Sequence, residues 1–100
     1  MDTREVLNKL SQYKVLISKH LEIENMILFG SYAKGSQNEN SDIDVAVIVN
    51  SINSDFFTYT PLLWKLRREI DLRIEPVLID KNEDQSGFLQ EIQKTGIVID

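Results

Sequence analysis

The sequence contains no cysteine, so disulfide bonds and thiolate metal sites are excluded. It is also short of positive charge: 11 lysines and arginines stand against 16 aspartates and glutamates, giving a formal net charge of -5. This balance argues against direct binding of DNA or RNA, which requires clustered basic side chains to displace counterions. The absence of cysteine is compatible with a reducing compartment, and we expect a cytoplasmic protein.

Long apolar runs are missing as well. The longest, Val45 to Val49, is far too short to span a bilayer, so we expect no membrane partner. The first ten residues are charged and amphipathic, unlike a signal peptide. With 100 residues, 42% of them hydrophobic, the chain has material for one core, which predicts a single domain over residues 1–100.

The chain has one histidine, His20, near the end of an expected helix. An imidazole there is more often a surface residue, favoured by the helix dipole, than a ligand or a base. The basic residues that do cluster are Lys65, Arg67, Arg68 and Arg73. We interpret them as a solvated helix face rather than as a groove for nucleic acid.

What the sequence does contain is a pair of carboxylates at the start of an apolar strand. Residues Met26 to Phe29 read as one short strand, and after a polar connection a second strand opens with Asp42 and Asp44 on either side of an isoleucine. Because strand side chains alternate between faces, the two aspartates project from the same side. Two like charges so close favour a cation between them, and hard oxygen ligands suit Mg²⁺.

The first strand is followed directly by Gly30 and Ser31. A glycine in this place lets the backbone approach a ligand closely. Residues Ser31 to Lys34 can form a helical turn whose free N–H groups point toward an anion. A metal site on one strand and a phosphate cradle after its neighbour together predict a nucleotide site.

The rest of the chain predicts helices around a small sheet. Asp2 is expected to cap a helix that runs to about Leu21, with apolar residues recurring at spacings of three and four. Thr60 and Pro61 predict the start of another helix, and Ser86 the cap of a last one. The fold class expected is α/β (α+β), with a mixed sheet of three to four strands flanked by about four helices.

A third strand is expected from Asp71 to Ile79. A strand, helix, strand connection favours a parallel crossover, so this strand should start near the start of the second one. Asp71 would then lie beside the first two aspartates as a third acid. Glu75 has the same parity but lies about 13 Å further along, and it remains the alternative third acid. Pro76 cannot donate to a ladder, which predicts an edge or a bulge there.

The motif resembles the nucleotidyltransferase superfamily that includes DNA polymerase beta, and most closely its minimal nucleotidyltransferase branch. That pattern is an apolar residue, Gly and Ser, a spacer of roughly ten residues, and then Asp, an apolar residue, Asp and another apolar residue. This sequence has Phe29-Gly30-Ser31, the spacer Tyr32 to Ser41, and Asp42-Ile43-Asp44-Val45. The inner positions Ala33, Lys34, Gly35 and Ser41 match as well.

The resemblance implies a polymerase beta-like fold and the transfer of a nucleotide from ATP, or another nucleoside triphosphate, to a hydroxyl group. Asp42 and Asp44 would bridge two Mg²⁺ ions, and the third acid, Asp71 or Glu75, would bind metal and accept the hydroxyl proton. The implied nucleotide-binding residues are Gly30, Ser31, Lys34 and Ser41. In the minimal branch the acceptor is a companion helical protein of the HEPN toxin class, modified with AMP on a tyrosine.

The first hypothesis is therefore an ATP-dependent protein adenylyltransferase with an antitoxin role, with or without self-association into a homo-oligomer. The alternative is a catalytically silent nucleotide-binding or partner-binding module of the same fold, favoured by the aromatic segment Phe56 to Trp64. Those aromatic residues could equally complete a small core. A calcium loop at Asn38 to Asp44 is excluded, because the EF-hand ligand spacing is absent.

Overall fold

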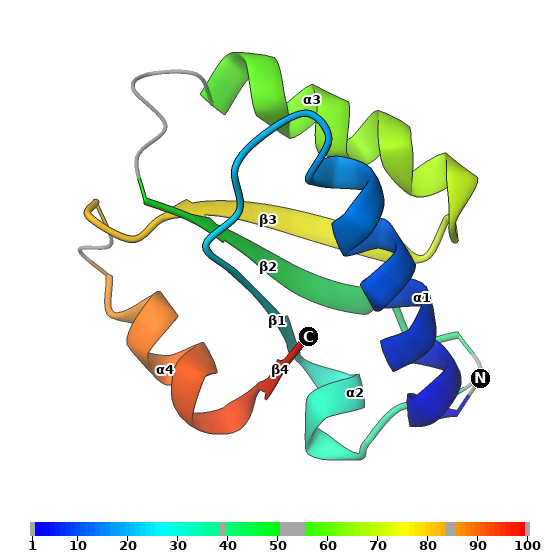
Figure 1. The fold of residues 1–100 in the computed structure, drawn as a ribbon. Coiled ribbons are helices and arrows are strands. Elements are labelled where there is room, and N and C mark those ends of the chain that lie inside the picture. The colour runs from blue at the N-terminus through cyan, green and yellow to red at the C-terminus, as the bar shows by residue number, and fades with distance from the viewer. Residues whose placement is uncertain (1, 39, 51–55, 84–85, 100) are drawn as a thin grey trace.

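The computed structural model describes residues 2–38, 40–50, 56–83 and 86–99. In this part of the chain, helices surround a four-stranded mixed sheet (Figure 1). The elements in order are α1 (Thr3–Ile17), β1 (Asn25–Phe29), α2 (Ser31–Lys34), β2 (Ile43–Val49), α3 (Phe56–Leu66), the 3-10 turn η1 (Arg67–Glu69), β3 (Ile74–Asp80), α4 (Phe88–Thr95) and β4 (Ile97–Val98). The predicted α/β class is confirmed.

The strands lie in the order β3-β2-β1-β4. β1 is antiparallel to both β2 and β4, whereas β2 and β3 are parallel, as the crossover through α3 predicts. β3 is therefore an edge strand, which agrees with Pro76, a residue that has no N–H to donate to a further strand.

Both faces of the sheet are covered. The α1 and α3 helices pack over one face, against the buried Val45 and Val47 of β2. The α4 helix packs over the other face through Leu89 and Ile92, against Ala46 and other alternate strand residues. Figure 1 shows α1 and α3 gathered on one side and α4 apart from them. The apolar run of β2 is thus buried on both sides, as its composition predicts.

The first helix follows from its cap and its apolar stripe. Asp2 caps α1 by accepting a hydrogen bond of 2.8 Å from the Glu5 N–H. The four stripe residues Val6, Leu10, Tyr13 and Ile17 are all buried. The helix ends at Ile17, before the predicted end. The Tyr13 hydroxyl donates to the Leu63 carbonyl at 2.7 Å, which ties α1 to α3.

The predicted start of α3 is wrong. The helix begins at Phe56, so Thr60 is not its cap and Pro61 lies inside it. An interior proline removes one backbone hydrogen bond. Pro61 is on the exposed side, where water can satisfy the carbonyl group that is left without a donor.

The aromatic segment of α3 divides between core and surface. Tyr59 packs against the core, and Trp64 lies beneath the Arg67 guanidinium, 4.5 Å from the ring centroid. Phe57 is 93% exposed. The side chain of Phe56 lies outside the described part of the structure.

The predicted start of β3 is also wrong. The strand begins at Ile74, because Arg67–Glu69 form a 3-10 turn and the three residues that follow Ile70 make a further turn. Asp71 therefore does not open the strand beside the two aspartates.

The last helix begins after Gly87, which is its cap in place of Ser86. The Ser86 hydroxyl instead accepts a hydrogen bond of 3.2 Å from the Phe88 N–H. Gly96 ends α4, and a Cβ there would overlap Ile27 and the Leu28 carbonyl, so the helix end packs tightly on β1. None of the helices in the described ranges combines the length and apolar composition needed to cross a bilayer.

Candidate active site

Two carboxyl groups meet across β2 and β3. Asp44 pairs with Phe29 of β1 on one side and with Glu75 of β3 on the other. Residues paired in this way point to the same face of a sheet, so the Asp44 and Glu75 side chains lie next to each other. Their carboxyl groups are close enough for a hydrogen bond between them. The structure thus brings Glu75, the alternative third acid, beside Asp44.

Asp42 completes this group of acids. It directly precedes β2 and is exposed, two residues before Asp44. Burial raises the pKa of Asp44; the hydrogen bond with Glu75 opposes that rise, and the Asp42 charge adds to it. Burial and the charges of both aspartates raise the pKa of Glu75, while Arg67 lowers it. Three acids at one end of the sheet therefore create a local excess of negative charge.

Asp71 forms ion pairs with two basic side chains. Its side chain is 9% exposed, and its carboxylate accepts a hydrogen bond from the Lys9 ammonium at 2.8 Å and another from the Arg73 guanidinium at 3.2 Å. Burial opposes ionisation of Asp71, but the hydrogen bonds from Arg73 and Lys9 outweigh it and hold its pKa well below the usual range. Lys9 is 62 residues from Asp71 in the sequence, so no local sequence pattern predicts this ion pair.

The low pKa of Asp71 predicts how stability responds to acid. A carboxylate with a depressed folded-state pKa contributes stability that is complete above its ordinary pKa, about 4, and is lost as pH falls through the folded-state value. The free energy of unfolding of Asp71→Asn should therefore depend less on pH below about 4 than that of the wild type. Urea unfolding of both proteins at successive pH values measures the difference, and parallel curves would contradict it.

Gly30 lies against the acids. Its backbone has φ +75° and ψ -150°, a conformation that side chains rarely adopt. A Cβ at this position would overlap the Asp44 carboxylate. Gly30 therefore allows the chain to turn from β1 into α2 while Asp44 lies close to the turn.

The α2 helix presents its first turn directly after Gly30. Ser31 is its first residue and Gly30 its cap, so the Ser31 hydroxyl is not the cap. The N–H groups of a first helical turn have no partner within the helix and are suited to an anion. Lys34 is exposed at the far end of the same turn.

Ser41 has a role in the loop before the acids. Its hydroxyl accepts a hydrogen bond of 2.8 Å from the Asn38 N–H, and its own N–H donates to the Asn38 carbonyl at 3.1 Å. These two bonds close the turn that leads into Asp42. The structure thus shows Ser41 supporting the backbone before the acid pair.

The donor chemistry of the acid group fits a divalent cation. Carboxylate oxygens are the ligands that Mg²⁺ prefers, and the mutual repulsion of Asp42, Asp44 and Glu75 would be relieved by positive charge. Among the described residues, no three His, Cys, Asp or Glu side chains are already gathered as a metal site. A cation would instead bind once the Asp42, Asp44 and Glu75 side chains adjust toward one another.

Comparison with known proteins identifies the family. The model of the family described as polymerase beta, nucleotidyltransferase, matches residues 11–100. The chain belongs to this nucleotidyltransferase family. Its resemblance to the minimal nucleotidyltransferases, drawn above from the glycine-serine and aspartate motifs, is confirmed, and the protein is an enzyme of the nucleotidyltransferase class.

Several similar proteins are named as protein adenylyltransferases or putative ones. Protein adenylyltransferase MntA of Shewanella oneidensis is 30% identical over 90 residues, which cover 90% of this chain and 63% of that protein. A Methanocaldococcus jannaschii protein, named as a putative protein adenylyltransferase, is 30% identical over 88 residues, covering 87% of this chain and 86% of its own length. A second protein of that organism with the same kind of name is 27% identical over 99 residues, covering 95% and 99%.

Solved structures share the fold. A crystal structure described as that of a putative nucleotidyltransferase from Sulfolobus solfataricus superposes with a TM-score of 0.68 at 18% identity, covering 96% of this chain and 80% of that one. The crystal structure described as the toxin-antitoxin with AMP-PNP has a TM-score of 0.64 at 27% identity, covering 92% and 72%. The nucleotidyltransferase fold is therefore shown for this chain.

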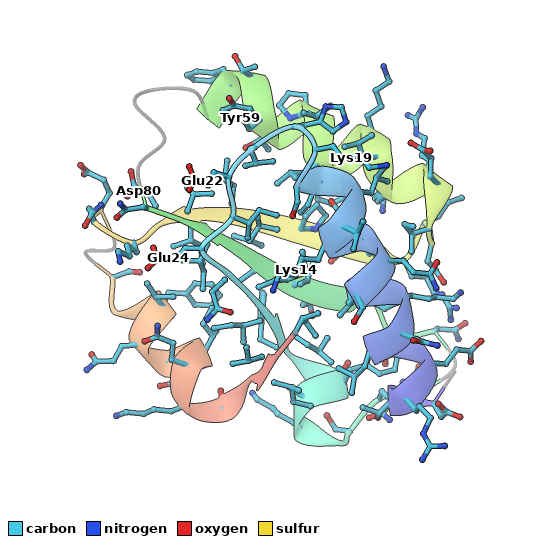
Figure 2. All side chains as sticks on the ribbon, in the orientation of Figure 1. Lys14, Lys19, Glu22, Glu24, Tyr59 and Asp80 are labelled. Carbon is cyan, nitrogen blue, oxygen red and sulfur yellow. The ribbon has the colours of Figure 1, made fainter. Side chains whose placement is uncertain are left out.

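Other acids of this nucleotidyltransferase lie at the opposite end of the sheet. Figure 2 shows Glu22, Glu24 and Asp80 together there, where β3 ends and β1 is about to begin. A surface hollow of about 260 Å³ at this end is lined in part by Glu22, Glu24 and Asn50. Because β2 and β3 are parallel, this end is the one away from Asp44 and Glu75.

Proposed function

We propose that this nucleotidyltransferase transfers AMP from ATP to a hydroxyl group of a protein, with Mg²⁺ as cofactor. The observation that carries the proposal is the placement of Asp44 between Gly30 and Glu75, at the turn into α2. Acids and a phosphate-binding turn are thereby adjacent, as phosphoryl chemistry requires.

Each residue has a proposed role. Asp42, Asp44 and Glu75 would hold two Mg²⁺ ions, which supply neutralisation of the phosphate charge when bound. The backbone of Gly30 and Ser31 would bind the β- and γ-phosphates. Glu75, at the edge strand beside Asp44, would accept the proton of the attacking hydroxyl, the role that the resemblance implies for the third acid. Lys34 and Ser41 are proposed only as supports of the phosphate turn and of the loop before Asp42.

The acceptor is proposed to be a helical partner protein of the HEPN type, and the biological role that of an antitoxin in the cytoplasm. The names of the relatives support a protein acceptor, and the structural neighbour supports a toxin partner and a nucleotide ligand. On this chain, the exposed Phe57 and the partly exposed Trp64 on α3 offer apolar surface for such a partner.

A catalytically silent binding module is the second candidate. The observation that favours it is the exposed aromatic surface of α3, where Phe57 is 93% exposed. A silent module would bind its partner equally well with or without the acid group.

The test uses labelled ATP, Mg²⁺ and the protein encoded by the adjacent reading frame. The proposal predicts that this protein acquires labelled AMP on a hydroxyl side chain. Tight binding of the two proteins without transfer of label would support the silent module instead. A reaction that proceeds equally well in excess EDTA would contradict the metal requirement.

A further inference from the structure

A cluster of three charged residues lies beside the acid group but outside it. The Asp71 cluster, as we call it, consists of Asp71, Lys9 and Arg73. Both oxygens of Asp71 are engaged: Oδ2 accepts from Lys9 at 2.8 Å and from Arg73 Nη2 at 3.2 Å, and Oδ1 accepts from Arg73 Nε at 3.3 Å. With its oxygens occupied by two cations, Asp71 is poorly placed to be the third acid.

The cluster shapes the turn that leads into β3. Asp71 Oδ1 also accepts a hydrogen bond of 2.8 Å from the Arg73 backbone N–H, and the Ile74 N–H donates to the Asp71 carbonyl at 3.2 Å. Both bonds fold residues 71–74 onto the Asp71 side chain and backbone. An aspartate that bonds the backbone two residues further on is a common way to fix a turn.

This turn sets the first contact between the two parallel strands. The Arg73 carbonyl accepts a hydrogen bond of 2.8 Å from the Ile43 N–H. The registers that follow are Ile43 with Ile74 and then Asp44 with Glu75. The position of Arg73 therefore decides where Glu75 lies relative to Asp44, because a slip of one residue would turn Glu75 to the other face.

The other end of the cluster is anchored in the core. Lys9 belongs to α1, and the next residue, Leu10, is fully buried among the core side chains. The Asp71 N–H donates to the Arg67 carbonyl at 2.9 Å, which adds a second anchor in the 3-10 turn η1, directly after α3. The turn before β3 is thus fastened to α1 and to η1.

We propose that Asp71 is a positioning residue: through Lys9 and Arg73 it fixes the start of β3 and so holds Glu75 beside Asp44. Its catalytic consequence rests on the proposed function, but its effect on the strand pairing does not. Asp71 contacts neither nucleotide nor metal in this account. Its loss loosens the first rung of the β2 and β3 pairing and lets the Glu75 carboxylate move.

The first arm of the test measures hydrogen exchange and needs no activity. In Asp71→Asn, exchange of the Ile43 N–H should speed up at least about 10-fold relative to the N–H groups further along β2. Glu24→Gln is the matched control, because it removes the Lys81–Glu24 ion pair, 2.6 Å long, at the other end of the sheet (Figure 2). A uniform change at all amides, or none, would show a merely structural residue and overturn the proposal.

The second arm measures AMP transfer by the whole protein at a temperature where every variant is folded. Asp71→Asn should lower kcat about 10- to 100-fold with KM for ATP little changed, as misplacement of a catalytic group does. In a Glu75→Gln background the same substitution should cost nothing further, because Asp71 acts through Glu75. A further loss there, as large as in the wild type, would make Asp71 an acid in its own right and overturn the proposal.

The two arms separate this inference from the proposed function. If the wild type transfers no AMP, the proposed function fails, while the exchange measurement still decides whether Asp71 fixes the strand start. If the wild type is active and the exchange of Ile43 in Asp71→Asn is unchanged, the positioning role fails alone.

Discussion

Asp44→Asn should lower kcat/KM for AMP transfer by about 10³-fold or more. Asp44 is the acid that contacts both halves of the site, since it pairs with Glu75 and lies against Gly30. An asparagine keeps the shape of the side chain but removes the negative charge that would hold Mg²⁺. Transfer of labelled AMP and release of pyrophosphate measure the effect. Glu24→Gln, a charge removed at the far end of the sheet, should leave both unchanged.

The same substitution should not weaken the fold. Burial raises the pKa of Asp44, the hydrogen bond with Glu75 opposes the rise, and the Asp42 charge adds to it. A carboxyl group whose pKa is raised on folding destabilises the folded state as pH rises through its ordinary value toward the folded-state value. At neutral pH, Asp44→Asn removes that unfavourable ionisation, so its Tm should be at least that of the wild type. A clear fall in Tm together with lost transfer would mean that Asp44 is needed for folding, and would contradict this account.

Gly30→Ala should destabilise the fold by about 3 kcal/mol, the sum of an unfavourable backbone conformation and overlap with a neighbour. Gly30 has φ +75°, and the added methyl group would overlap the Asp44 carboxylate. For a chain of 100 residues such a loss lowers Tm by about 12 °C or more. Transfer activity should fall as well, because Asp44 must move to make room. Thermal unfolding and the AMP-transfer assay measure the two effects.

Gly35→Ala is a control for a methyl group added at a glycine with positive φ and no close neighbour. Gly35 has φ +76° and ψ 15°, the left-handed helical region, which is less restricted than the conformation of Gly30, and a Cβ there would meet nothing within 4 Å. Its substitution should cost only the backbone preference, about 1 kcal/mol. In an Asp44→Ala background, the cost of Gly30→Ala should also shrink, because the overlapping carboxylate is gone. An equal cost of Gly30→Ala in the wild type and in the Asp44→Ala background would show that the contact with Asp44 has no energetic weight.

The sequence predicts the central part of the site because strand periodicity is local information. Alternation along β2 predicts that Asp44 shares a face with Ala46 and Ile48, and all three do lie on the face toward α4. The glycine after β1 and the helical turn after it are equally local, and α2 occupies the expected residues, Ser31–Lys34. These features needed no knowledge of the rest of the chain.

The third acid and the helix start depended on information that is not local. A strand beginning at Asp71 and one beginning at Ile74 have similar apolar patterns; the difference is made by the 3-10 turn after α3 and by Lys9 from α1. The turn formed by Asp71 and Arg73 is the one local signal that could have moved the prediction toward Glu75. The predicted helix start at Thr60 and Pro61 is wrong because α3 tolerates an exposed proline in its interior.

The Arg67 guanidinium also limits how a further strand could pair with the edge strand β3. It donates to the carbonyl groups of Leu72 and Ile74, just before and at the beginning of the edge strand β3. Further along the same strand, Pro76 has no N–H to offer. A strand from another molecule that paired with β3 would find the Ile74 carbonyl already bonded to Arg67 and no N–H at Pro76. The addition of further strands at this edge, of the kind that leads to fibrils, is therefore disfavoured. Another molecule that contacts this edge near Glu75 would therefore do so through side chains rather than through main-chain hydrogen bonds.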